Sequence, residues 1–250
     1  MDETTPLASG LTPSQIELFI TDGFVRIAEA FPRALADEAR AILWRATRCS
    51  PDDPTTWTEP VIRLSMFTKA PFVDAANTAR LQAAFDQLVG PGLWRRPEAM
   101  APSQYAFRQP SIPVTPDGTS TRASKGRALL MLFLFSDVAE RDAPTLIRVG
   151  SHADIARQLA PAGEQGLTLG ELAADDFAAS AHRAVVPATG DAGTVYLCHP
   201  FLVHAAQPHQ GERPRFLAQP PLLPLDPDRR GRGELSPVDQ AVARALGGRP

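Results

Sequence analysis

One stretch near the C-terminal end of the chain decides the fold. It is Gly190–Leu222, which reads GDAGTVYLCHPFLVHAAQPHQGERPRFLAQPPL. A glycine-rich turn opens it, and short apolar runs come next, separated by proline and glycine. The runs at Thr194–Cys198, Val203–Ala206 and Pro214–Gln219 predict three short strands. Short strands separated by tight turns are typical of a sandwich or a barrel.

Three more strands are predicted upstream of this stretch, the first a short one over Phe24–Ile27. The mostly apolar run Arg127–Val138 indicates a buried strand, and Thr145–Val149 indicates another, closed by Gly150-Ser151-His152. Helix signals lie mainly near the two ends of the chain: a capping box at Thr12–Gln15, a start at Pro32, a run over 77–89, a short helix opened by Thr168, and a last helix with Ser236 as its N-cap. Helices first and strands later, without a repeat, predict an α+β domain.

Composition narrows the class of protein. The 250 residues are 44% hydrophobic and 21% charged, which suits a single globular domain with a full core. The longest apolar run, Ala128–Phe135, is too short to cross a bilayer, so we expect no membrane association. The net charge of −3 argues against a nucleic-acid partner. The two cysteines, Cys49 and Cys198, lie far apart, which favours a reducing cytoplasm over a disulfide framework.

We expect one domain over residues 1–250. Its first ten residues are polar and predicted to be frayed, and residues 226–250 form a C-terminal extension with a short helix. Three tryptophans, Trp44, Trp57 and Trp94, are expected to anchor the core and loops, and Cys198 is expected to be an inert buried thiol.

The stretch at 190–222 resembles the distal half of the phytanoyl-CoA dioxygenase family, whose members are Fe(II)- and 2-oxoglutarate-dependent oxygenases. Leu132–Val138 with Ala143–His152 is similar to the central strands of that family, and Leu11–Ile27 is similar to its opening. The resemblance covers about residues 11–225 and is poor over 97–124. It implies a double-stranded β-helix, a jelly-roll or cupin-like core with flanking helices.

The resemblance also implies roles for individual residues. His204 corresponds to the distal metal ligand, and Arg215 corresponds to the arginine that pairs with the far carboxylate of 2-oxoglutarate. Arg213 is the alternative cofactor-binding arginine, since residues two apart share one side of an extended strand.

The proximal half of the expected metal site departs from the family pattern. Non-haem iron oxygenases hold Fe(II) with two histidines and one carboxylate, and in this family a His-x-Asp pair precedes the Arg127–Val138 strand. All five histidines of this chain come after residue 151. One alignment keeps Asp117 as the carboxylate with Thr115 in the histidine position; the other puts Arg108 and Pro110 in the two ligand positions. The candidates for catalysis are therefore His204, Arg108 and Asp117, and those for a metal are His204 and Asp117.

Three functions stay open at this point. The first is a family member with a degenerate iron site that performs metal-independent chemistry on a small organic molecule, or acts as a pseudo-oxygenase. The second is a hydroxylase, a non-haem iron dioxygenase that uses Fe(II) and 2-oxoglutarate with an unusual ligand set. The third is a non-catalytic binding module. Each takes a small-molecule ligand, and the cofactors are Fe(II) and 2-oxoglutarate or none. The sequence does not indicate whether the protein is a monomer or an oligomer.

Three other histidines have expected structural roles. On a regular strand His199 faces away from His204, which favours a structural hydrogen bond. His152 is expected to bond the backbone at its turn. His209, in a turn between the last two predicted strands, is expected to be solvated, with a substrate contact as the alternative.

Overall fold

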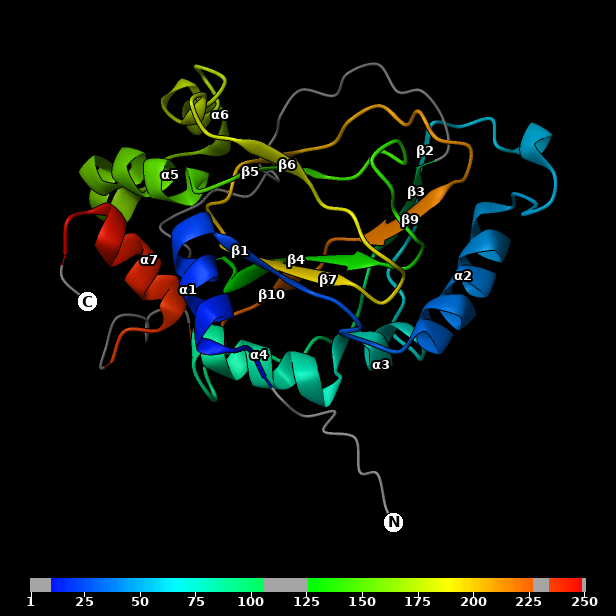
Figure 1. Ribbon diagram of the computed structural model, residues 1–250, viewed down its shortest axis with the longest axis horizontal. Coiled ribbons are helices and arrows are strands. Elements are labelled where there is room, and N and C mark those ends of the chain that lie inside the picture. The colour runs from blue at the N-terminus through cyan, green and yellow to red at the C-terminus, as the bar shows by residue number, and fades with distance from the viewer. Residues whose placement is uncertain (1–9, 106–125, 227–233, 249–250) are drawn as a thin grey trace, which may run out of the picture.

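The computed structural model describes residues 10–105, 126–226 and 234–248. Two antiparallel sheets face each other at its centre, and helices lie below them and at their two ends (Figure 1). Within the described residues the larger sheet has the order β1-β7-β4-β9-β3-β2, with β10 paired to β4, and the smaller has the order β6-β5-β8. The strands of the larger sheet are β1 (Phe24–Ile27), β2 (Val61–Arg63), β3 (Pro102–Tyr105), β4 (Leu129–Leu134), β7 (Val195–Cys198), β9 (Arg215–Ala218) and β10 (Pro221–Leu222). Those of the smaller sheet are β5 (Leu146–Arg148), β6 (Val185–Pro187) and β8 (His204–Ala205).

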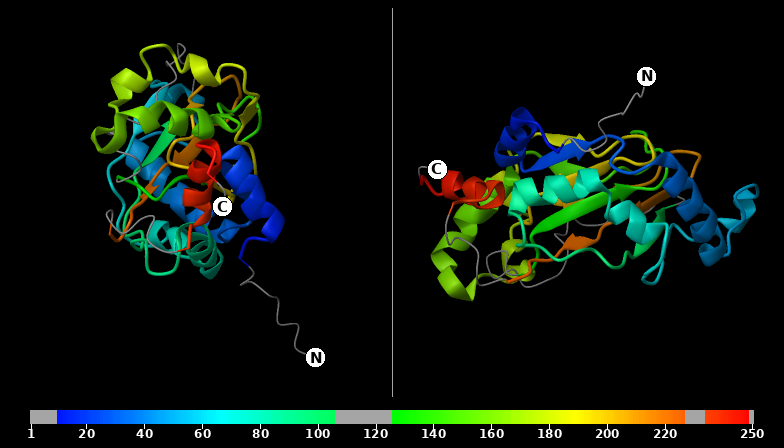
Figure 2. Two further views of the ribbon diagram at one scale, coloured as in Figure 1. Left: turned by 90° about the vertical axis from the view of Figure 1, so that its left-hand side faces the viewer. Right: turned by 90° about the horizontal axis from the view of Figure 1, so that it is seen from below.

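The helices flank the larger sheet and extend beyond its ends. They are α1 (Pro13–Asp22), α2 (Arg33–Thr47), α3 (Phe72–Ala76), α4 (Ala79–Val89), α5 (Ser151–Leu159), α6 (Leu169–Leu172) and α7 (Pro237–Ala245), with 3₁₀ turns at Pro54–Thr56, Ala160–Gln165 and Ala178–Ser180. Seen from below, α4 crosses in front of the strands (Figure 2). In the described ranges, no helix is long and apolar enough to cross a membrane.

The larger sheet is buried on both faces, and β4 shows why its sequence is continuously apolar. Leu129, Met131 and Phe133 pack against the helices. Residues of the opposite parity turn toward the smaller sheet and form an inner cluster. The inner cluster consists of Leu130, Leu132, Leu134, Val138, Ile147, Ala188, Tyr196, Cys198, Leu202 and Leu217, with Phe24 and Val186 packed against it.

The turn before β7 is fixed from two sides. Asp137 accepts hydrogen bonds from Arg33 at 2.8 Å through each of its carboxylate oxygens and from the Ala192 N–H at 2.9 Å. The Arg33 guanidinium lowers the pKa of Asp137 to about 2. Gly193 has φ +98°, and a Cβ there would lie 2.5 Å from the Phe31 carbonyl oxygen. Only glycine suits this position, since it combines a left-handed backbone with a close backbone neighbour.

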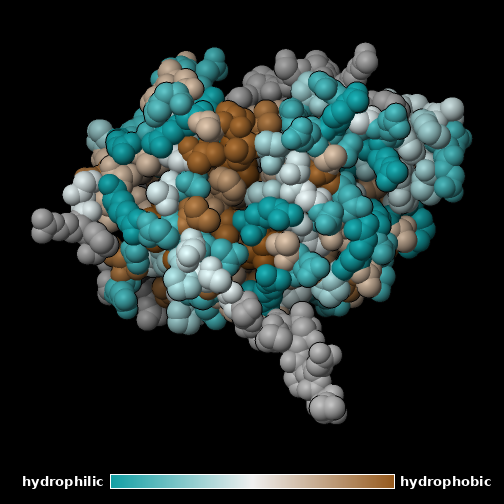
Figure 3. Space-filling view, viewed as in Figure 1, coloured by the Kyte–Doolittle hydropathy of each residue, from teal (hydrophilic) through white to brown (hydrophobic). Residues whose placement is uncertain are grey.

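The strands and caps predicted from the sequence are largely confirmed. α1 begins with the Thr12–Gln15 capping box and ends at Gly23 in the left-handed region, and α7 begins at the Ser236 cap. The prediction missed α3, α5, β2, β6 and β10. Ser151 and His152 close β5, as expected, but they also start α5. Polar residues cover most of the face in Figure 3, apart from an apolar area near the smaller sheet.

Candidate active site between the two sheets

His204 faces the space between the two sheets. It lies on β8, one end of the described three-stranded sheet, directly opposite Ile147 of β5. Paired residues in an antiparallel ladder point to the same face, and Ile147 belongs to the inner cluster. His204 is 8% exposed. The register therefore places its imidazole inside the barrel-like core.

The hydrogen bond of His204 fixes the chemistry of its ring. Nδ1 lies 3.0 Å from the carbonyl oxygen of Leu202. A carbonyl can only accept, so Nδ1 carries a proton, and in the neutral ring Nε2 carries the lone pair. This is the tautomer that a metal ligand or a general base uses.

Arg215 faces the same space from the opposite sheet. It begins β9, where Phe216 and Ala218 pack on the helices and Leu217 belongs to the inner cluster. Alternation along the strand puts Arg215 on the side of Leu217. Its side chain is 1% exposed. The structure thus brings His204 and Arg215 to the two facing sheets of one core.

The Gly150-Ser151-His152 turn holds the chain that leads into β8. Gly150, at φ +73°, donates its N–H to the Asp22 carbonyl at 2.7 Å. The buried Ser151 Oγ accepts the Val203 N–H at 2.9 Å, one residue before His204. His152 Nε2 lies 3.1 Å from the Ile20 carbonyl, which confirms the expected backbone bond of this histidine. Burial lowers the pKa of His152 to about 4.

His199 serves the packing of the helices and not the space between the sheets. Its Nδ1 accepts the Phe201 N–H at 3.1 Å, so Nε2 is the protonated nitrogen that points to the Val238 carbonyl at 3.3 Å. The predicted structural hydrogen bond is confirmed. Burial raises the pKa of the neighbouring Cys198 thiol, which keeps it protonated.

Two residues of the β8–β9 connection differ in their burial. His209 is 2% exposed, so the expectation that it is solvated is wrong. Arg213 is exposed and precedes the first residue of β9, so the alternation of that strand does not reach it. Of the two arginines, Arg215 is the one on the inner face.

The proximal candidates lie outside the described residues: Arg108, Pro110, Thr115 and Asp117. The segment 106–125 contains Asp117 as its single carboxylate and has no histidine, cysteine or glutamate. Across the described part of the chain, no three His, Cys, Asp or Glu side chains are grouped to hold a metal.

The tryptophans anchor the core and loops, as predicted. Trp44 meets Phe216 edge-on at 5.0 Å between ring centroids. Trp57 Nε1 donates to the Ser50 carbonyl at 2.6 Å, and Trp94 Nε1 donates to Asp86 at 2.8 Å.

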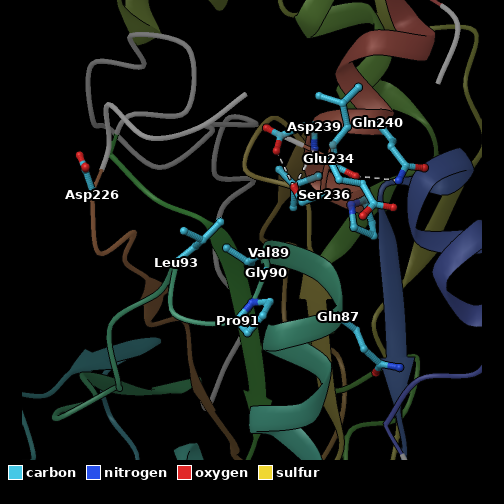
Figure 4. A pocket seen from close by; sticks show the side chains of 13 residues that line it. Gln87, Val89, Gly90, Pro91, Leu93, Asp226, Glu234, Ser236, Asp239 and Gln240 are labelled. Carbon is cyan, nitrogen blue, oxygen red and sulfur yellow. Dashed lines mark hydrogen bonds between the residues drawn. The ribbon is translucent and has the colours of Figure 1, made fainter. Parts of the chain in front are cut away.

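A hollow of about 380 Å³ lies away from His204 and Arg215, between the C-terminal end of α4 and the start of α7 (Figure 4). Three carboxylate residues, Asp226, Glu234 and Asp239, line it. Asp239 accepts the Ser236 hydroxyl at 2.6 Å, so this part of the hollow is the cap of α7.

Fold and site together define the class of protein: a double-stranded β-helix with a histidine and an arginine between its sheets. The sequence model described as phytanoyl-CoA dioxygenase matches residues 19–217. The chain belongs to the phytanoyl-CoA dioxygenase family, within the Fe(II)/2-oxoglutarate oxygenases. A search of the curated proteins found no match.

Solved structures share this fold at low sequence identity. HygX from Streptomyces hygroscopicus, solved with nickel, 2-oxoglutarate and hygromycin B, has a TM-score of 0.56 at 17% identity, over 90% of this chain and 97% of its own. The α-ketoglutarate-dependent carbocyclase SnoK from nogalamycin biosynthesis has a TM-score of 0.57 at 16% identity, over 85% and 84%. EctD from S. alaskensis has a TM-score of 0.56 at 19% identity, over 89% and 78%.

Proposed function

We propose that this chain is an oxygenase-family protein with a degenerate iron site, which binds a small organic carboxylate between its sheets and acts on it without Fe(II)/2-oxoglutarate chemistry. One observation carries the proposal: all five histidines come after residue 151. The segment 106–125, where the family has its proximal ligands, therefore has no imidazole to offer.

The remaining histidines do not replace the missing ligand. His152 and His199 hydrogen-bond backbone carbonyls outside the inner cluster, and His182 is exposed. His209 directs Nε2 to the Arg213 carbonyl at 2.8 Å. His204 and Asp117 are left as two protein ligands where the family uses three. Because Fe(II) ranks low among divalent metals in affinity for a given site, such a site would hold it weakly.

The residues that are present suit binding and proton transfer. The buried guanidinium of Arg215 has the planar fork that pairs with a carboxylate through two parallel hydrogen bonds. The Nε2 lone pair of His204 would accept a proton from the ligand, forming an imidazolium, and return it to another ligand atom. Such a transfer needs no oxidant and is general acid–base catalysis. That structural neighbours were solved with small molecules, such as hygromycin B, supports a small-molecule ligand.

The first test is an anaerobic titration of chelator-stripped protein with Fe(II) and 2-oxoglutarate, monitored by the visible charge-transfer band of the chelate. We expect no saturable band and no iron in the protein as purified. Calorimetry with 2-oxoglutarate in the presence of a chelator then tests the anion site. Arg215→Gln should weaken binding at least tenfold, whereas Arg213→Gln, the exposed control two residues away, should leave it unchanged.

The second candidate function is a Fe(II)/2-oxoglutarate hydroxylase with an unusual ligand set. The His204 tautomer and the inward-facing Arg215 favour it. A saturable band that disappears in both His204→Ala and Asp117→Asn would establish it and overturn the metal-independent hypothesis. Carboxylate binding without conversion of any ligand would leave the third function, a binding module.

A further inference from the structure

A buried histidine, His209, bonds the chain two residues before Arg215. His209 lies in the connection between β8 and β9 and is 2% exposed. Its Nε2–H donates a hydrogen bond to the carbonyl oxygen of Arg213 at 2.8 Å. Its Nδ1 is buried and makes no hydrogen bond within the described part of the chain. A nitrogen of this kind can take a proton without giving up an existing bond.

Charged groups act on His209 from two elements. The connection that carries it packs on the β4–β5 loop, where Gln210 donates its N–H to the Arg141 carbonyl at 2.8 Å. Asp142 comes from that loop, and Arg215 comes from the start of β9. Burial lowers the pKa of His209; the backbone of Arg213 and of Gly211 and the carboxylate of Asp142 raise it, and the guanidinium of Arg215 lowers it. The net direction is down, so the ring is neutral at pH 7.

We propose that His209 is a positioning residue of the anion site, which takes up a proton from solvent when a carboxylate binds to Arg215. The inference rests on the proposed function, since it needs an anion at that arginine. Without the anion, a protonated His209 would stand close to the Arg215 cation, and like charges disfavour each other. A bound carboxylate removes this repulsion and adds an attraction. Imidazole then becomes imidazolium, and one proton leaves the buffer for each anion bound.

Linkage sets the size of the effect. An affinity coupled to the uptake of one proton changes by at most about tenfold per pH unit. Between pH 7.5 and 6.0 we expect carboxylate affinity to rise roughly three- to tenfold, because burial lowers the pKa of His209 in the free protein and a bound anion raises it. The probe, 2-oxoglutarate, adds no proton of its own, since carboxyl groups of ordinary pKa, about 4, stay ionised above pH 6.

The experiment is calorimetric titration of the full chain with 2-oxoglutarate, with chelator present, at pH 6.0 and 7.5 in two buffers of different ionisation enthalpy. The wild type should bind more tightly at pH 6.0, with a buffer-dependent heat that reports proton uptake. His209→Gln keeps an N–H for the Arg213 carbonyl but cannot be protonated, so its affinity should be independent of pH. His182→Gln, at an exposed position, should behave as the wild type.

The outcomes separate the two proposals. Arg215-dependent binding without proton uptake in the wild type overturns the role of His209 and leaves the anion site standing. The same pH dependence in His209→Gln also overturns it. Absence of any Arg215-dependent binding overturns both. Because the buffer comparison uses the wild type, the test holds even if a variant fails to fold.

Discussion

Ser151→Ala should destabilise the protein because it removes a single buried hydrogen bond. Ser151 is fully buried, and its hydroxyl accepts the N–H of Val203, which is 1% exposed. Removing the oxygen leaves a buried donor unpaired, which costs about 1–3 kcal/mol. With a value of about 2 kcal/mol, and a denaturant slope of about 3 kcal/mol per molar urea for a chain of this size, the unfolding midpoint should fall by about 0.7 M.

The assay is urea unfolding monitored by tryptophan fluorescence and by circular dichroism. Both signals should shift together with an unchanged slope. Ser65→Ala removes the hydroxyl of an exposed serine and should move the midpoint by less than about 0.2 M. A shift that small for Ser151→Ala would refute the idea that this turn holds the entry to β8.

Three further predictions concern backbone, pH and core. Gly193→Ala would place its Cβ 2.5 Å from the Phe31 carbonyl oxygen and should cost at least about 2 kcal/mol in urea unfolding, whereas Gly126→Ala meets no atom within 4 Å and should be neutral. His152 has a pKa of about 4 when folded, against an ordinary 6.5, so the unfolded chain binds more protons between these values. Stability should therefore fall by up to about 3 kcal/mol from pH 6.5 to pH 4, and His152→Gln should flatten that part of the curve; an unchanged curve would exclude His152 as its cause. Leu132→Ala opens a cavity in the inner cluster and should cost about 2–5 kcal/mol; a loss below about 1 kcal/mol would mean that the two sheets do not pack as described.

The strands could be predicted because their signals are local. The β4 run is apolar at every position, and the turn at 190–193 carries two glycines, so both signals can be found without knowledge of distant parts of the chain. The helix α5 could not be predicted in the same way, because Gly150-Ser151-His152 closes β5 and starts the helix at the same place. A turn signal in the sequence does not identify the element on its far side.

Parts of the candidate site could also be predicted from the sequence, and other parts are known only from the fold. The apolar run around Arg215 predicts its strand, but its inward direction is known only from the fold, where Leu217, on the same side of β9, belongs to the inner cluster. The burial of His209 could not be predicted, because it depends on the contact between two loops about 70 residues apart, at Gln210 and Arg141. Ser151 belongs to a Gly-Ser-His motif that is visible in the sequence, but its partner, Val203, is known only from the fold.

The arrangement around β8 bears on which function is correct. Ser151 fixes the residue before His204, the register with Ile147 turns the imidazole inward, and the Leu202 carbonyl selects the tautomer. A metal ligand needs all three, but so does a general base, since both use an oriented lone pair on Nε2. The order around His204 is therefore no argument for iron. The count of imidazoles separates the two roles, because a base works alone and the family's iron site needs a second histidine. With none before residue 151, we propose that His204 moves a proton on a ligand held by Arg215 and does not share a metal.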